Sequence, residues 1–201
     1  MGHQKGAERI DEIVKYACEM GIRILTIFAF STENWKREQK EISFLFQLFS
    51  DYARNKIDDI NSRGIRVRIL GNLNRIPPAL NDELFNIMTL SEKNEKMIVN
   101  IAINYGGRDE LVRTFNKILL LKPSENSITE ELISNNLDTI GLPDPDLIIR
   151  TSGEQRLSNF LLWQSAYSEL YFTKIYWPDF DKNQFDIALK EFQNRKRRLG
   201  K

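Results

Sequence analysis

The chain has 201 residues, enough for one domain with a substantial core. Its 29 Lys and Arg residues nearly balance 28 Asp and Glu residues, so a formal charge of +1 gives no general attraction to nucleic acid or an anionic membrane. The single cysteine, Cys18, excludes an internal disulfide and a cysteine-rich metal site and suits the cytoplasm. Since no stretch approaches the ~18 apolar residues of a spanning helix, we expect a soluble protein with at most peripheral membrane contact.

The spacing of apolar residues predicts helices that alternate with strands. Residues 4–20 have helical spacing, and Gly21 ends that helix. The run IRILTIFAF at 22–30 predicts a strand covered on both faces, because it is mostly apolar and consists largely of β-branched and aromatic residues. Further helices are expected at 39–62, 78–93, 108–121, 128–136 and 181–198, and further strands at 65–71, 97–104, 147–150 and 169–175.

This alternation predicts a single α/β domain with a mainly parallel central sheet flanked by helices, because a helix usually connects successive parallel strands. No repeat or linker divides the chain, so residues 1–201 are expected to form one domain. In such a sheet, ligands bind beyond the carboxyl ends of the strands. The segments to inspect there are 31–37, 71–75, 105–110 and 151–158.

Arginines gather in these segments. Arg37, Arg108 and Arg156 lie within them, and Arg150 lies at a strand end. Guanidinium groups beside hydroxyl and backbone N–H donors suit a diphosphate or a carboxylate. The alternative is a solvated or structural role, since loops are polar in general. No Walker loop or GxGxxG follows a strand, so nucleotide binding lacks its usual signature.

The helix expected at 39–62 has two apolar stripes. The first comprises Ile42, Leu45, Phe46, Phe49, Ala53 and Ile57, and the second comprises Phe44, Leu48 and Tyr52. A helix lying on a sheet needs only one such stripe. The second is therefore expected to meet another helix, another subunit or an apolar ligand. Together with the arginines, it suggests an amphiphilic ligand with a charged head and a hydrocarbon tail.

Several motifs resemble those of the cis-prenyltransferases, the family of the bacterial undecaprenyl diphosphate synthases. They are FSTENW (30–35), NYGGR (104–108), DLIIRTSGEQRLSNFLLWQSAYSELYF (146–172) and WPDF (177–180). The resemblance covers essentially the whole chain and implies the cis-prenyltransferase fold. It also implies addition of isopentenyl diphosphate, with Z geometry, to an allylic diphosphate such as farnesyl diphosphate, which makes a long-chain polyprenyl diphosphate for a cell-wall lipid carrier. Magnesium and a homodimer are implied as well, with an apolar tunnel walled by the helix at 39–62 and Ala29 at its side.

The resemblance further implies roles for individual residues. Asn34 matches the residue assigned to proton removal; because a neutral amide oxygen is a poor base, we expect it to position the reacting groups or to relay the proton to the departing diphosphate. Glu169 is expected to ligate Mg²⁺ through oxygen. The expected substrate-binding residues are His3, near the allylic diphosphate; Ser31, Thr32, Glu33, Trp35 and Arg37, in the pocket; Arg150, Arg156, Leu157 and Ser158, at the isopentenyl diphosphate; and Arg198 and Gly200, reaching into the partner subunit's site.

One family feature is not found in these 201 residues. Family members carry a first strand and a loop of the form Asp-Gly-Asn-Gly-Arg-Trp before the match to GHQKGAERI, and that aspartate holds the magnesium. The domain is therefore expected to be N-terminally truncated, and this exact chain to be impaired in catalysis. Three explanations stay open: a misassigned start, a truncated gene with an inactive product, and a non-catalytic partner subunit. Another α/β phosphotransferase is the remote alternative.

Overall fold

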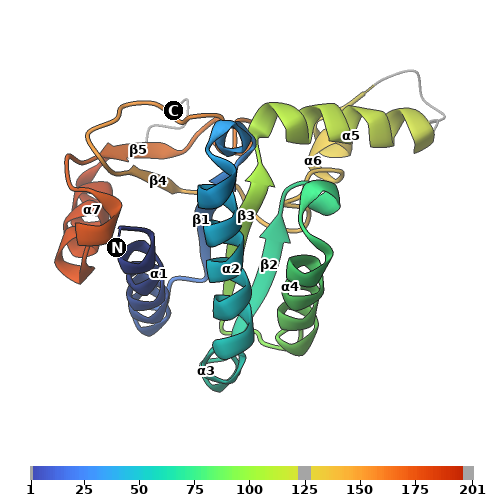
Figure 1. Ribbon diagram of the computed structural model, residues 1–201. Helices are drawn as coiled ribbons and strands as arrows, with labels where there is room; N and C mark the ends of the chain where they lie inside the picture. Colours follow the sequence, from blue (N-terminus) through green and yellow to red (C-terminus); the bar gives the residue numbers. More distant parts are fainter. Residues whose placement is uncertain (1, 122–127, 197–201) are drawn as a thin grey trace.

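A computed structural model describes residues 2–121 and 128–196 and shows the predicted alternation of helices and strands (Figure 1). The helices are α1 (Gly2–Glu19), α2 (Gln39–Asn55), α3 (Ile57–Ser62), α4 (Pro78–Leu90), α5 (Gly107–Leu121), α6 (Glu130–Ser134) and α7 (Lys182–Asn194). The strands are β1 (Ile24–Ser31), β2 (Ile65–Leu70), β3 (Met97–Tyr105), β4 (Leu147–Arg150) and β5 (Glu169–Phe172). Short 3₁₀ turns are η1 (Thr32–Lys36), η2 (Leu73–Arg75) and η3 (Trp177–Asp179).

The strand pairings are parallel, as predicted, but they form two sheets. One sheet has the order β1-β3-β2, and the other pairs β4 with β5. The expectation that β1 is covered on both faces is not met, because only Ile27 and Phe30 in it are buried and its other residues are partly exposed. The physical reason is that β1 pairs with β3 along one edge, while its other side borders a cavity.

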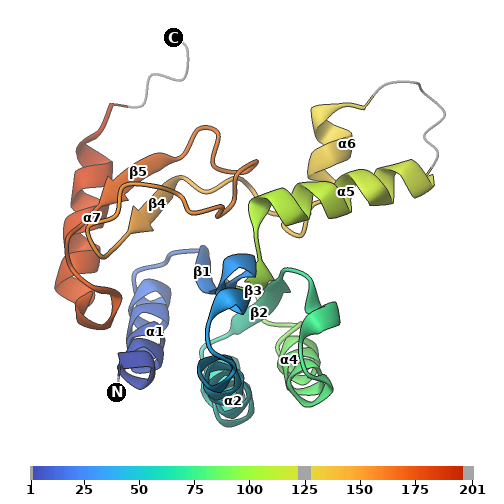
Figure 2. The ribbon, with the colours of Figure 1, turned by 45° about the horizontal axis from the view of Figure 1, so that its top comes forward.

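Helices α1, α2 and α4 lie along one face of the three-stranded sheet (Figure 2). Apolar side chains of α2 and α4, such as Phe46 and Leu84, pack there against Phe30 and Ile103 of the sheet. On the other side, Leu161 packs against Tyr105 with Leu70 and Ala102. Each such buried side chain contributes roughly 1.5–3 kcal/mol through the hydrophobic effect. The sheet is thereby fixed from both sides, which holds its strand-end loops in place.

The helix predicted over 39–62 is interrupted at Lys56. The Lys56 ammonium pairs with the Asp11 carboxylate of α1 at 2.8 Å, and the chain then turns into α3, which buries Ile60. The closing helix also ends earlier than predicted, at Asn194. The apolar segment 159–167 forms turns, and three residues around its start, Ser158, Asn159 and Leu161, have positive φ angles.

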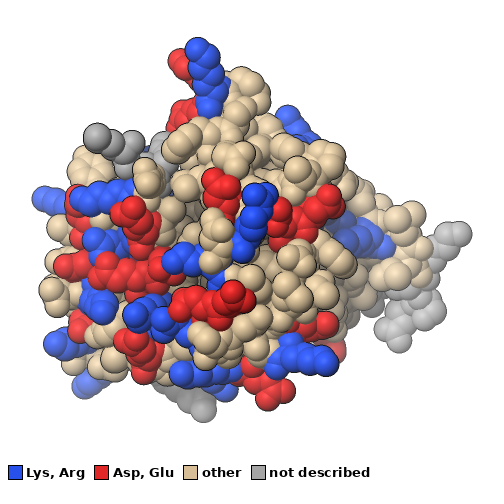
Figure 3. Space-filling view, turned by 60° about the horizontal axis from the view of Figure 1, so that its bottom comes forward, with Lys and Arg blue, Asp and Glu red and all other residues tan. Residues whose placement is uncertain are grey.

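The surface seen in Figure 3 carries Lys and Arg interspersed with Asp and Glu rather than one dominant sign. This pattern agrees with the near-zero net charge of the sequence. Among the residues that the structure describes, no helix combines the length and the apolar character needed to cross a membrane.

Candidate functional site

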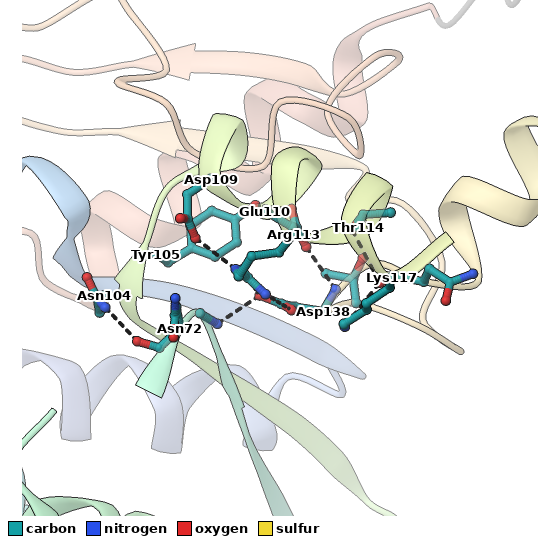
Figure 4. A network of polar contacts seen from close by, with 12 residues as sticks. Asn72, Asn104, Tyr105, Asp109, Glu110, Arg113, Thr114, Lys117 and Asp138 are labelled. Atoms are coloured by element: carbon teal, nitrogen blue, oxygen red, sulfur yellow. Dashed lines mark hydrogen bonds and ion pairs between the residues drawn. The ribbon is translucent and has the colours of Figure 1, made fainter. Parts of the chain in front are cut away.

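Three predicted segments, 31–37, 71–75 and 105–110, follow the carboxyl ends of parallel strands and meet at one edge of the sheet, as the sequence predicts. Asn104, at the end of β3 with a φ of 48°, connects them. Its side-chain amide donates to the carbonyl of Asn72 at 2.5 Å (Figure 4), and its side-chain oxygen accepts from the Trp35 indole N–H at 2.7 Å. The amide side chain of Asn104 thus joins the segments 31–37 and 71–75.

A cavity of about 1120 Å³ lies between β1 and β4 and is bordered by α1 and α7 as well. Five of the predicted site residues line it: Asn34, Arg37, Arg150, Arg156 and Leu157. The structure therefore brings three of the four arginines singled out in the sequence to one space. The fourth, Arg108, is exposed and does not line this cavity.

Arg150 is the least satisfied of these arginines. Its Nε is buried and has no hydrogen-bond partner among the described residues. A buried donor without an acceptor costs ~1–3 kcal/mol, and more when it is charged. Arg37 and Arg156 pair instead with Glu41 and Glu154, and both guanidinium groups are substantially exposed. Exposed pairs of this kind contribute ~0–1 kcal/mol, so an anion with several oxygens can replace them readily.

Asn34 lines the same cavity from η1. Its side-chain oxygen accepts from the Ser31 backbone N–H at 2.9 Å. The acceptor of the amide is therefore engaged within the turn, and its NH₂ group is the part left to orient a ligand. This geometry suits a positioning group better than a proton acceptor.

A smaller apolar crevice of about 80 Å³ adjoins the cavity, and the two share lining residues: Ala7, Ile10, Ala29, Leu48 and Phe49. Of the second stripe of α2, Leu48 and Tyr52 border the crevice, whereas Phe44 is 50% exposed. The crevice is about half the volume of an engineered ~150 Å³ cavity that binds benzene. A long hydrocarbon tail can therefore enter it only if the surrounding helices move apart.

Glu169 is not brought to the cavity. In β5, the residue that pairs with Arg150 is Phe172. Glu169 comes three residues earlier in the same strand, so its backbone lies about 10 Å from that of Phe172. Its carboxylate accepts from Arg195 at 2.9 Å. Within 2–121 and 128–196, no group of three or more His, Cys, Asp or Glu side chains is placed to hold a metal ion.

Other predicted residues also lie away from the cavity. The Trp35 ring packs against Phe30 and Phe46, with the Arg75 guanidinium 4.5 Å from the centre of a Trp35 ring. The other predicted site residues that do not line the cavity are Ser31, Thr32, Glu33 and Ser158. The side chain of His3 and the whole of Arg198 and Gly200 lie outside the described part of the structure.

A buried polar network beneath these loops was not predicted (Figure 4). Glu110 is 1% exposed and accepts from the Tyr105 hydroxyl at 2.5 Å, the Asp138 N–H at 2.9 Å and the Gln164 amide at 3.1 Å. Burial raises the pKa of Glu110, and the hydrogen bonds from Tyr105 and Gln164 only partly oppose this. One signal was available in the sequence, since Glu110, Thr114 and Ile118 are four residues apart on the buried face of α5.

Comparisons with known proteins agree with this geometry. Residues 1–200 match the family described as "Putative undecaprenyl diphosphate synthase". An isoprenyl transferase of Clostridium tetani is 45% identical over 206 residues, which cover 100% of this chain and 80% of that protein. A ditrans,polycis-undecaprenyl-diphosphate synthase ((2E,6E)-farnesyl-diphosphate specific) of Legionella pneumophila is 41% identical, covering 99% and 85%. The crystal structure of lavandulyl diphosphate synthase from Lavandula x intermedia, in complex with dimethylallyl diphosphate, has a TM-score of 0.95 at 35% identity, covering 100% and 88%.

Proposed function

Because the chain belongs to the undecaprenyl diphosphate synthase family and is a prenyltransferase, we propose that it condenses isopentenyl diphosphate with an allylic diphosphate to extend a Z-prenyl chain. The observation that supports this most directly is the buried, unpartnered Nε of Arg150 at a cavity that adjoins an apolar crevice. An anionic head and a hydrocarbon tail are the two parts that such a site accommodates. The name of the Legionella relative supports farnesyl diphosphate as the primer, and we propose a polyprenyl diphosphate precursor of a cell-wall lipid carrier as the product.

Several of the residues that line the cavity have a part in this proposed reaction. Arg150 and Arg156 bind the diphosphate of the isopentenyl unit through charge-assisted hydrogen bonds, with Leu157 beside them. A carbon–carbon bond then forms, the allylic carbon–oxygen bond breaks, and the isopentenyl unit loses a proton. The Asn34 NH₂ group orients the reactants, and the departing diphosphate takes the proton. The apolar crevice by Ala29 receives the tail as the surrounding helices move apart, and it excludes water.

The family generally depends on magnesium, and we propose Mg²⁺ as the cofactor, with Glu169 as its protein ligand. The described residues do not by themselves fit this ion at the cavity, because Glu169 is paired with Arg195 away from the cavity and no group of three or more His, Cys, Asp or Glu side chains is placed to hold a metal within 2–121 and 128–196. A loop of the Asp-Gly-Asn-Gly-Arg-Trp form is not found in these 201 residues. The cavity between β1 and β4 supports the proposal that a further strand bearing such a loop completes this domain.

We also propose that the protein is a cytoplasmic homodimer that binds no nucleic acid and touches membranes only at product release. Helix α5 supports the dimer, since three apolar side chains on one stripe are exposed: Val112 by 60%, Phe115 by 40% and Leu119 by 69%. Exposed apolar groups that gather in one patch mark interaction surfaces more often than scattered ones do. A second copy of α5 would cover this stripe. The proposed part of Arg198 and Gly200 in the partner's site concerns residues outside the described ranges.

The experiment is an elongation assay on the purified 201-residue chain with farnesyl diphosphate, radiolabelled isopentenyl diphosphate and Mg²⁺. The proposed reaction predicts label in organic-extractable products longer than farnesyl, lost in Arg150→Met; such products would also show that the expected impairment of this exact chain is wrong. Binding of isopentenyl diphosphate without elongation would instead identify an impaired or non-catalytic subunit. Tight binding of ATP without binding of isopentenyl diphosphate would favour a phosphotransferase and overturn the proposal.

A further inference from the structure

Asn159 lies where three loops meet. Its side-chain NH₂ donates to Glu33 in η1 at 2.9 Å, and its side-chain oxygen accepts from the Arg108 backbone N–H at 2.9 Å. Its own carbonyl accepts from the Gly107 N–H at 2.7 Å. One residue thus joins the loop after β4, the turn after β1 and the first turn of α5.

The backbone at this junction is held in a conformation that the loop would not choose alone. Ser158 and Asn159 have φ angles of 51° and 64°, in the left-handed region that residues with a Cβ seldom occupy. Asparagine tolerates this region better than most residues because its short side chain bonds locally. The two side-chain hydrogen bonds and the carbonyl contact are what keep the loop in this form.

The glycines at the junction are closely packed against the neighbouring loops. A Cβ on Gly106 would lie 2.5 Å from the Thr32 hydroxyl oxygen and 2.7 Å from the Asn159 side-chain nitrogen. A Cβ on Gly107 would lie 2.7 Å from the Leu162 side chain. The glycines therefore let the three loops approach within contact distance, and the Asn159 hydrogen bonds then fix their relative position.

We propose that Asn159 is a positioning residue for the diphosphate site, an inference that rests on the proposed function. Glu33 directly precedes Asn34, and Asn159 follows Arg156 and Leu157 by three and two residues. The Glu33–Asn159 hydrogen bond thus sets the distance between the two sides of the cavity that carry the diphosphate-binding and orienting groups. It also holds a carboxylate away from the anion, because Glu33 does not line the cavity.

The ionisation of Glu33 agrees with this role. Burial works to raise the pKa of its carboxyl group, but hydrogen bonds from Asn159 and from neighbouring groups in η1 outweigh it and lower the pKa. Glu33 is consequently an acceptor at neutral pH, and the amide of Asn159 is a suitable donor for it. An aspartate at position 159 would place a second carboxylate against the first.

The test is calorimetric titration of the whole chain with isopentenyl diphosphate. Asn159→Asp is expected to weaken binding at least tenfold at neutral pH. Combining it with Glu33→Gln exchanges the amide and the carboxylate, which restores the hydrogen bond, and is expected to recover affinity to within threefold of the unchanged chain. Gln155→Ala, an exposed change in the same loop, is the matched control. Unaltered affinity in Asn159→Asp, or no recovery in the double variant, would overturn the inference.

A second measurement separates this inference from the proposed function. If the unchanged chain binds no isopentenyl diphosphate, the proposed function fails. Amide hydrogen exchange in the free chain then tests whether Asn159 holds the three loops together. Asn159→Asp is expected to speed exchange in 31–37 and 105–110 as well as in its own loop, with recovery in the double variant. Faster exchange confined to 157–161 would show that Asn159 does not tie the loops together.

Discussion

Replacing Glu110 by alanine should destabilise the protein by about 3 kcal/mol. The Tyr105 hydroxyl and the Asp138 N–H each lose the only acceptor that they have among the described residues, at ~1–3 kcal/mol per buried donor. Gln164 is affected less, because its amide also donates to the Thr139 hydroxyl at 3.0 Å. Burial of the Glu110 carboxylate is unfavourable and raises its pKa. The alanine variant no longer has this cost, which offsets part of the lost stability.

Urea unfolding followed by tryptophan fluorescence at pH 7 measures this loss. Glu95→Ala, at an exposed carboxylate, is the matched control and should change the unfolding free energy by less than ~0.5 kcal/mol. Glu110→Gln should cost only about 1 kcal/mol, because it keeps one acceptor and removes the charge. A loss for Glu110→Ala no larger than that of the control would refute the assignment of Glu110 as the acceptor that holds this network.

The pH dependence gives a second, signed test of the same network. Because the pKa of Glu110 is raised in the folded state, that state holds the proton more tightly than the unfolded chain, whose carboxyl titrates near ~4.3. The free energy of unfolding of the unchanged protein, relative to that of Glu110→Gln, should therefore increase as the pH falls from 7 through the raised pKa toward the pKa of the unfolded chain. A relative decrease would show that the buried carboxylate is stabilised by its donors more than it is penalised by burial.

The remaining predictions concern the crevice, the loop junction and α5. Ala29→Leu adds atoms where the cavity and crevice meet, so product chains should shorten on thin-layer chromatography; unchanged lengths would place the tail elsewhere. Gly107→Ala forces a Cβ to within 2.7 Å of Leu162 and should cost ~1–3 kcal/mol in urea unfolding, unless the loop relaxes freely. Leu119→Glu should convert a dimer to a monomer in light scattering, whereas Lys117→Glu on the same helix should not; a monomeric unchanged chain would contradict the α5 interface.

Much of the fold was predictable because its signals are local. Apolar runs bounded by polar loops gave the strands, and helical spacing gave the long helices. The break at Lys56 was not predictable, since the ion pair at that turn is made with Asp11, 45 residues earlier in the chain. The partial burial of β1 was missed for a similar reason, because an apolar sequence does not say whether a second strand pairs with its free edge.

The site was predicted less evenly than the fold. Arg150 was identified because it lies at a strand end near other arginines and hydroxyl groups that suit a diphosphate, and its unpartnered Nε agrees with a ligand role. Asn159 carries no charge and follows more conspicuous residues, so its importance is apparent only from the two loops it contacts. Trp35 was placed in the pocket by motif position, yet its side chain turns into the apolar cluster beside α2.

A crystal structure of the chain with isopentenyl diphosphate tests the central claim most directly. Phosphate oxygens should lie within hydrogen-bonding distance of the Arg150 Nε and the Arg156 guanidinium, with the hydrocarbon end directed toward Ala29. A diphosphate bound outside the cavity between β1 and β4, with the Arg150 Nε still unpartnered, would contradict the account.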